Sequence, residues 1–279
     1  MAIVTFWGNN PKSTGQSLSA GAVAMYMAME HNYKCLLLST QYEDNAYEKA
    51  FGVTKHTKSF LRNILKGRDT GLDSGIEGLT KMAISNRLSP ELIPNYTKVA
   101  IKTLEVLPGP RKIDDTTDYE KILNSYKTLI SNADKYYDYV FVDLNKTLEL
   151  PQIRVILEMS DIIIVNVEQK IARLDEFMEL RNNEPILQGN KVMLLVNKYD
   201  SFSQYNTKNI TRYLGEKKEI FAVPYNTLYF EAAEEGGVVD LFFRIRKVDE
   251  GDRNFSFIRE LKRVTDGIIY KLQELHMRV

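Results

Sequence analysis

Residues 3–17 of the chain read Ile3-Val4-Thr5-Phe6-Trp7-Gly8-Asn9-Asn10-Pro11-Lys12-Ser13-Thr14-Gly15-Gln16-Ser17. A short apolar run comes first, a polar loop with glycines follows it, and residues 17–30 then have the spacing of a helix. A strand, a loop and a helix in this order place free backbone N–H groups and the positive end of the helix dipole around an anion. The segment therefore predicts a phosphate-binding loop.

This loop departs from the usual pattern of Gly, four residues, Gly, Lys and then Ser or Thr. Gly15 and Ser17 keep their places, whereas Asn10 replaces the first Gly and Gln16 replaces the Lys. Ser17, at the helix start, is a candidate Mg²⁺ ligand. The motif alone is also compatible with a ligand-free turn in which a loop hydroxyl caps the helix.

Apolar runs recur along the rest of the chain between amphipathic stretches. Several are apolar on successive residues, which is typical of strands whose sheet is covered on both faces. Their alternation with helical segments predicts an α/β, doubly wound, mostly parallel sheet of about seven strands flanked by helices. The expected strands are 3–7, 35–38, 104–107, 139–142, 162–167, 192–196 and 220–223, and expected helices include 17–30, 119–132, 171–180 and 205–214.

Length and composition favour one large domain. The chain has 279 residues, a net charge of zero, 44% hydrophobic and 27% charged residues, which excludes disordered and fibrous classes. We expect a single domain over 1–279, with an irregular helical excursion at about 52–98 and an amphipathic C-terminal helix at about 254–276. Cys35 is the single cysteine and no apolar run approaches the roughly 20 residues that span a bilayer, so we expect a cytoplasmic protein.

Polar residues stand at the ends of three later expected strands. Asp143 ends the run 137–143, Asn197 follows the strand at 192–196, and Pro224 and Asn226 follow the strand at 220–223. Ligands of doubly wound folds bind beyond the carboxyl ends of the strands, so we expect these residues to border one cleft. Asp143 is suited to be a second Mg²⁺ ligand.

Taken in order, these segments resemble the MinD/ParA class of P-loop ATPases, the SIMIBI proteins with a deviant Walker A loop. That class carries a deviant phosphate loop, an acid-ended strand, an Asn after a later strand, and a Pro-bearing segment followed by Glu-Ala and Gly, here at 231–236. The resemblance covers nearly the whole chain and implies a P-loop NTPase-like fold, a homodimer and a protein partner. The segment 104–109 also looks like a strand of TadZ/CpaE-type pilus-assembly positioning proteins.

The resemblance implies ATP and Mg²⁺ as cofactors. Ser17 and Asp143 would hold the metal, while Asn197, Pro224 and Asn226 would border the base. Residues 197–200 also match the guanine-reading Asn-Lys-x-Asp pattern, so GTP stays open as the nucleotide. The residues that would contact the phosphates are Lys12, Ser13, Thr14, Gly15, Gln16 and Ser17.

The departures from the class bear on hydrolysis. A loop Lys that contacts the β- and γ-phosphates and a second Lys that reaches across the dimer are replaced by Gln16 and Pro11, with Lys12 one residue away. Gln41 stands where an acid helps to position the attacking water. Because cations and donors placed against developing charge supply most of the rate of phosphoryl transfer, the two losses predict a weak ATPase or pseudo-ATPase.

Three functional hypotheses remain. The leading one is a ParA/MinD-like nucleotide-binding positioning or assembly factor, for example of a pilus or secretion machine, with impaired or absent ATP hydrolysis. Lys12 and Gln41 are the candidate catalytic residues. The first alternative is an active ATPase in which Lys12 contacts the phosphates and Glu43 or Asp44 helps with the attacking water, and the second is a nucleotide-free scaffold. Interleaved acids and bases near the C-terminus disfavour DNA binding, and peripheral membrane contact is open but not favoured.

Overall fold

The computed structural model describes residues 1–9, 14–42, 46–53, 75–111, 116–145 and 148–277. Its strands are β1 (Ala2–Trp7), β2 (Cys35–Ser39), β3 (Lys98–Ile101), β4 (Leu104–Leu107), β5 (Tyr139–Leu144), β6 (Ile162–Val167), β7 (Val192–Tyr199) and β8 (Ile220–Pro224). Its helices are α2 (Gln16–Glu30), α3 (Ala46–Ala50), α5 (Ile76–Ile84), α6 (Thr116–Asp134), α7 (Pro151–Met159), α8 (Ile171–Asn183), α9 (Thr207–Tyr213), α10 (Thr227–Glu235), α11 (Val238–Ile245) and α12 (Phe255–His276), with short 3-10 helices at Pro90–Asn95 and Pro185–Leu187.

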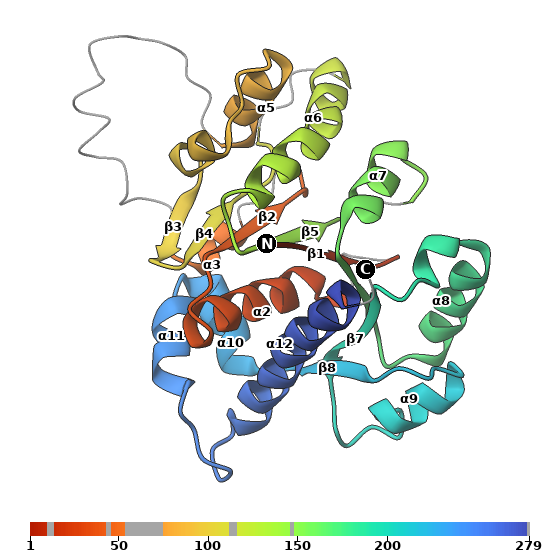
Figure 1. Ribbon diagram of the computed structural model, residues 1–279. Helices are drawn as coiled ribbons and strands as arrows, with labels where there is room; N and C mark the ends of the chain where they lie inside the picture. The colour runs from red at the N-terminus through yellow and green to blue at the C-terminus, as the bar shows by residue number, and fades with distance from the viewer. Residues whose placement is uncertain (10–13, 43–45, 54–74, 112–115, 146–147, 278–279) are drawn as a thin grey trace.

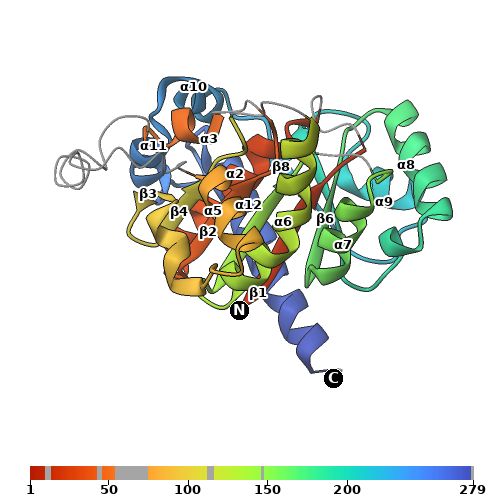
Figure 2. The ribbon, with the colours of Figure 1, turned by 90° about the horizontal axis from the view of Figure 1, so that it is seen from above.

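The eight strands form one sheet in the order β3-β4-β2-β5-β1-β6-β7-β8. All neighbouring pairs are parallel except β3 with β4. Helices cover both faces of the sheet, as Figures 1 and 2 show. The expected α/β, doubly wound and mostly parallel architecture is confirmed.

The strand β3 was not predicted, so the sheet has eight strands rather than about seven. It is short and lies antiparallel at the edge of the sheet, where Val99 is 45% exposed. A half-exposed edge strand lacks the continuous apolar run by which the other strands were found. It begins at the end of the region 52–98, of which the structure describes α5 and a 3-10 helix, while residues 54–74 lie outside the described residues.

Two apolar layers hold the helices to the sheet. The layer under α2, α10, α11 and α12 takes Val4 and Phe6 from β1, while the layer under α5 to α9 takes Ile3 and Trp7 from the same strand. Side chains of a strand point alternately to its two faces, so a strand between two helical layers must be apolar on successive residues.

The long helix α12 packs along β8 and α2 (Figure 1). Its buried apolar side chains recur every three or four residues, as at Leu261, Val264, Ile268 and Leu272. Its last turns extend beyond the body of the domain (Figure 2). Among the described residues, no helix combines the length and the apolar character that crossing a membrane would require.

The strand order places a topological switch point at β1. From β1 the chain passes through α2 to β2 on one side, whereas β6 lies on the other side of β1. Ligands of open α/β sheets bind at such a point, outside the carboxyl ends of the strands. The loop before α2 and the end of β5 meet there.

Candidate functional site

The centre of this edge is a hydrogen bond between Gln16 and Asp143. The strands β1 and β5 are neighbours, with Phe6 paired to Asp143, and α2 begins at Gln16. The Gln16 amide nitrogen Nε2 donates to Oδ1 of Asp143 at 2.7 Å and lies 3.2 Å from the carbonyl oxygen of Phe6. Both side chains are fully buried. Gln16, which stands where the class has its loop Lys, is therefore hydrogen-bonded to Asp143, the candidate metal ligand.

Tyr47 of α3 covers the other side of the same carboxyl. Its hydroxyl oxygen lies 2.8 Å from Oδ2 of Asp143 and 2.9 Å from the carbonyl oxygen of Ser17, and the ring is 4% exposed. A phenol carries one proton, so it satisfies both contacts only when Asp143 is protonated and donates to the phenol oxygen. The sequence did not single out Tyr47, because a tyrosine in a five-residue helix carries no motif.

The environment of Asp143 keeps its carboxyl hard to ionise. Burial raises the pKa of Asp143 above its usual value, although hydrogen bonds from Ser17, Gln16, Tyr47 and Asn145 act in the opposite direction. All four of these side chains are neutral. The side chains that surround the acid therefore supply hydrogen bonds without a compensating positive charge.

Gly15 and Lys198 bring a cation to the phosphate loop. Gly15 precedes α2 with φ of 75°, a left-handed conformation that favours glycine. A Cβ placed on Gly15 would lie 3.0 Å from Cε of Lys198, so the lysine stem packs directly over the loop. Lys198 itself has φ of 50° and lies at a register shift between β7 and β8. The sequence placed Lys198 only within the guanine-reading pattern, not at the phosphates.

The remaining loop residues are only partly described. The hydroxyl of Thr14 accepts a hydrogen bond from the backbone of Gln16 at 3.3 Å. Lys12 and Ser13 lie outside the described residues. The structure thus brings Thr14, Gly15, Gln16, Ser17 and Asp143 together at one point of the edge.

The side chain of Asn197 is buried against Asn166 of the neighbouring strand β6. Its side chain is 2% exposed and its Nδ2 donates to Oδ1 of Asn166 at 2.7 Å. Asn166 in turn donates to the carbonyl oxygen of Trp7 at 3.0 Å. The amide oxygen of Asn197 is buried without a hydrogen-bond partner in the described parts of the chain.

Pro224 and Asn226 lie at the end of β8. Pro224 is opposite Tyr199 across the register shift. Asn226 caps α10, since its Oδ1 accepts from the backbone of Tyr229 at 2.8 Å while its Nδ2 donates to Asn254 at 2.9 Å. Asn226 therefore has a clear role in holding α10, whatever else it contacts.

Two further residues bear on the choice of reaction and base. The backbone N–H of Gln41 donates to the Ser39 hydroxyl at 3.2 Å, and Gly109 packs so closely on Gln41 that a Cβ there would meet its carbonyl oxygen at 1.9 Å. The backbone of Gln41 is thus closely packed just beyond the end of β2.

The carboxyl of Asp200 accepts a hydrogen bond from the backbone of Phe202 at 2.9 Å, in the turn that follows β7.

The oxygen donors of Ser17 and Asp143 are of the type that Mg²⁺ prefers. Within the described ranges, no group of three or more His, Cys, Asp or Glu side chains is placed to hold a metal ion. A magnesium ion here would take few protein ligands and complete its shell with phosphate and water, as Mg²⁺ commonly does. It would also have to displace Gln16 and Tyr47 from the Asp143 oxygens.

Comparisons with known proteins show solved structures of similar fold. No family model matches the chain, and no curated protein matches it. A ParA family ATPase from Chlorobium tepidum TLS is similar with a TM-score of 0.70 at 14% identity, covering 96% of this chain and 98% of that one. MinD from Pyrococcus horikoshii OT3, complexed with Mg-ADP, gives 0.64 at 14% identity, covering 97% and 98%.

A chain of the MinC:MinD cell division protein complex of Aquifex aeolicus gives a TM-score of 0.63 at 12% identity, covering 96% of each chain. At these identities the likeness concerns the fold. It extends over nearly the full length of both partners in each comparison. The chain has the fold of the MinD/ParA-class P-loop ATPases.

Proposed function

We propose that this chain is a ParA/MinD-like nucleotide-binding factor that acts in positioning or assembly and hydrolyses ATP poorly or not at all. The observation that carries the proposal is the 2.7 Å hydrogen bond between Gln16 and Asp143. Hydrolysis in this fold needs a cation against the β- and γ-phosphates and a metal held near the acid. Here the neutral Gln16 stands where the cation is needed, and its amide is hydrogen-bonded to the acid beside which the metal would bind.

Nucleotide binding is supported by the geometry around Gly15. A helix of 15 residues begins directly after the left-handed Gly15, so its first N–H groups and its dipole face the loop. Lys198 packs over the same glycine and brings a positive charge near the expected phosphates. The similar MinD of Pyrococcus horikoshii was solved with Mg-ADP, which favours the same ligand class here.

In the proposed mechanism, binding competes with the internal contacts of Asp143. A bound Mg²⁺ would neutralise charge on the phosphates, and the oxygens of Ser17 and Asp143 would hold it. Gln16 and Tyr47 must first release the carboxyl of Asp143. Breaking those hydrogen bonds costs free energy and so weakens the binding of Mg-nucleotide. Asn197 and the backbone near Pro224 would border the base, with ATP preferred because the order of the segments resembles that of the MinD/ParA ATPases.

The biological role follows from the class rather than from the site. One similar chain was solved as the MinC:MinD complex, so a protein partner is part of the proposal, as are a homodimer and a cytoplasmic location. A pilus or secretion machine of the TadZ/CpaE type is the partner we would test first.

A nucleotide-free scaffold is the second candidate. The closure of both Asp143 oxygens by Gln16 and Tyr47 favours it, because a buried carboxyl that has its partners within the protein has less need of a metal. The active-ATPase alternative depends on Lys12.

Calorimetry and thermal shift with Mg-ATP and Mg-GTP test binding, followed by phosphate release for turnover. Saturating nucleotide, at about 100 times its dissociation constant, should add roughly 2.7 kcal/mol to the free energy of unfolding. Gln16→Lys together with Gln41→Asp should raise turnover more than either change alone, since both groups act on one transition state. Gln273→Lys, exposed on α12, is the matched control.

Ordinary ATPase turnover in the wild type, lost in Lys12→Ala, would replace the proposal with the active enzyme. Binding of neither nucleotide by the wild type or by the double variant would favour the scaffold.

A further inference from the structure

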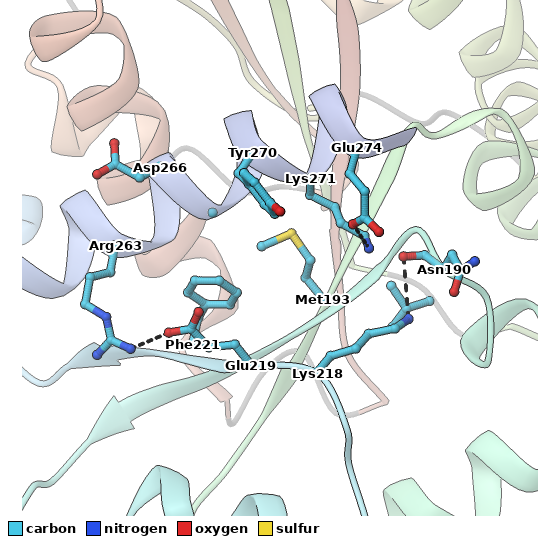
Figure 3. Close-up of a pocket in the computed structure, with 12 residues that line it drawn as sticks. Asn190, Met193, Lys218, Glu219, Phe221, Arg263, Asp266, Tyr270, Lys271 and Glu274 are labelled. Atoms are coloured by element: carbon cyan, nitrogen blue, oxygen red, sulfur yellow. Dashed lines mark hydrogen bonds and ion pairs between the residues drawn. The ribbon is translucent and has the colours of Figure 1, made fainter. Parts of the chain in front are cut away.

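A cavity of about 620 Å³ lies at the opposite edge of the sheet from the candidate nucleotide site (Figure 3). It is bounded by the first residues of β7 and β8 and by α12 from Arg263 to Glu274. The parallel strands begin at this edge and end at the other, so a ligand here would not contact the Gln16–Asp143 pair. Its volume falls within the roughly 300–1,000 Å³ of small-molecule sites.

The floor and one wall of this cavity are apolar. Met193 of β7 and Phe221 of β8 form the floor, and the ring of Tyr270 points toward Met193 from α12 (Figure 3). Gly267 lets the helix approach, because a Cβ there would lie 2.4 Å from the Phe221 ring. Tyr270 is 68% exposed although its ring borders this apolar floor. A flat apolar group could therefore lie between Tyr270 and the floor.

Two lysines stand at one end of the cavity. Lys218 donates to the carbonyl oxygen of Gly189 at 3.0 Å, and Lys271 pairs with Glu274 at 2.6 Å. Partial burial lowers the pKa of Lys218, and the positive charge of Lys271 lowers it further, while Glu216 and Glu274 act in the opposite direction. A negative charge between the two ammonium groups would relieve their repulsion. At the other end Arg263 is paired with Glu219, so that end offers no comparable excess of positive charge.

We propose that this cavity binds a small amphiphile with a flat apolar body and a single anionic head group. The body lies over Met193 and Phe221 under the ring of Tyr270, and the head lies between Lys218 and Lys271. Each ammonium has three N–H donors, and the contacts with Gly189, Asn190 and Glu274 leave donors for the head group. This site is independent of nucleotide binding.

The test uses 1-naphthaleneacetate as the anionic probe and 1-naphthaleneacetamide as its neutral analogue. The readout is the methyl signal of Met193 in methionine-methyl-labelled protein, assigned with Met193→Leu. The carboxylate should shift this signal saturably, and the amide should bind about tenfold more weakly because it lacks the charge-assisted hydrogen bonds. This comparison is made on the wild-type protein.

Variants then locate the head group. Lys218→Gln and Lys271→Gln should each weaken the carboxylate about tenfold and leave the amide unchanged. Lys262→Gln, exposed on the same helix, should change neither. An absent or non-saturating Met193 shift, equal affinity for acid and amide, or unchanged affinity in both lysine variants would each overturn the proposal.

Discussion

At position 16 an amide lies against a buried carboxyl, and this pair governs the chemistry of the edge. Hydrogen bonds to a charged group contribute about 1.5–3 kcal/mol each, whereas removing a carboxylate from water costs several kcal/mol. Because the side chains that contact Asp143 are neutral, Gln16 and Tyr47 among them, desolvation outweighs the hydrogen bonds and the pKa of Asp143 is raised. An anionic nucleotide alone would add to this penalty, so Mg²⁺ should be required for binding.

Tyr47→Phe should tighten Mg-ATP binding about threefold to tenfold. The variant removes the hydroxyl that competes for Oδ2 of Asp143, and a net hydrogen bond contributes about 0.5–1.5 kcal/mol. Tyr229→Phe is the matched control. It loses a 2.8 Å hydrogen bond to the carbonyl oxygen of Leu18, which lies on α2 beside Ser17, and it leaves the contacts of Asp143 unchanged. Calorimetric titration of both variants measures the difference. Equal affinities in the two would rule out competition by Tyr47.

Asp143→Asn should remove a pH dependence of stability. A carboxyl whose pKa is raised by folding binds its proton more tightly in the native state. Its contribution to the free energy of unfolding is therefore complete below the ordinary pKa of about 3.9 and is lost as pH rises through the folded value. The wild-type free energy of unfolding minus that of Asp143→Asn, from urea titrations, should fall as pH rises above about 4. A difference that rises with pH would mean that Asp143 is stabilised as the anion.

At the scale of elements, the short helix α3 is held by its contact with α10. Gly52 after α3 has φ of 64° and Gly236 after α10 has φ of 85°. A Cβ on Gly236 would lie 3.0 Å from the carbonyl oxygen of Lys49, and one on Gly52 would lie 2.9 Å from that of Gly236. The ion pair of Lys49 with Glu234 is exposed and adds little. The position of Tyr47 over Asp143 therefore depends on two glycines far apart in the chain.

Gly236→Ala should destabilise the protein more than Gly215→Ala. Both positions have positive φ, so each substitution costs about 1 kcal/mol in backbone strain. A Cβ on Gly215 meets nothing within 4 Å, whereas one on Gly236 meets backbone of α3. We expect an additional loss of about 1 kcal/mol or more from overpacking in Gly236→Ala, measured by urea unfolding. Equal losses of unfolding free energy in the two variants would show that α3 and α10 can move apart without destabilising the protein.

At the scale of the whole molecule, the sheet encloses the chain's single cysteine. Cys35 lies in β2 between β4 and β5, is fully buried, and burial raises the pKa of its thiol. Because the thiolate is the reactive form, the native thiol should be inert. Its reactivity should report opening of the central sheet.

Labelling of Cys35 by an aromatic disulfide reagent should therefore require unfolding. If Mg-ATP binds only the folded protein, about 100 times its dissociation constant should slow labelling about 100-fold in the regime where refolding outpaces reaction. Labelling at the rate of a free thiol without denaturant would contradict the buried position. Slow labelling that nucleotide leaves unchanged would favour the scaffold alternative.

The parallel sheet and the loop before α2 could be predicted because both depend on local order along the chain. Successive apolar residues, as in β6, report a strand between two helical layers, and Gly15 followed by Ser17 reports a turn into a helix. The edge strand β3 escaped because its half-exposed residues carry no such period. The helix α7, which has nine residues and begins at Pro151, was not among the expected helices.

The contacts within the candidate site could be seen only in the folded structure. Gln16 could be recognised as a missing cation, but its bond to Asp143 joins residues 127 positions apart, and the contact of Tyr47 with the same acid spans 96. Lys198 packs over Gly15 from a register shift between β7 and β8, 183 positions along the chain. Local periodicity carries no information about such contacts, since side-chain direction and helix docking are settled by packing between distant segments.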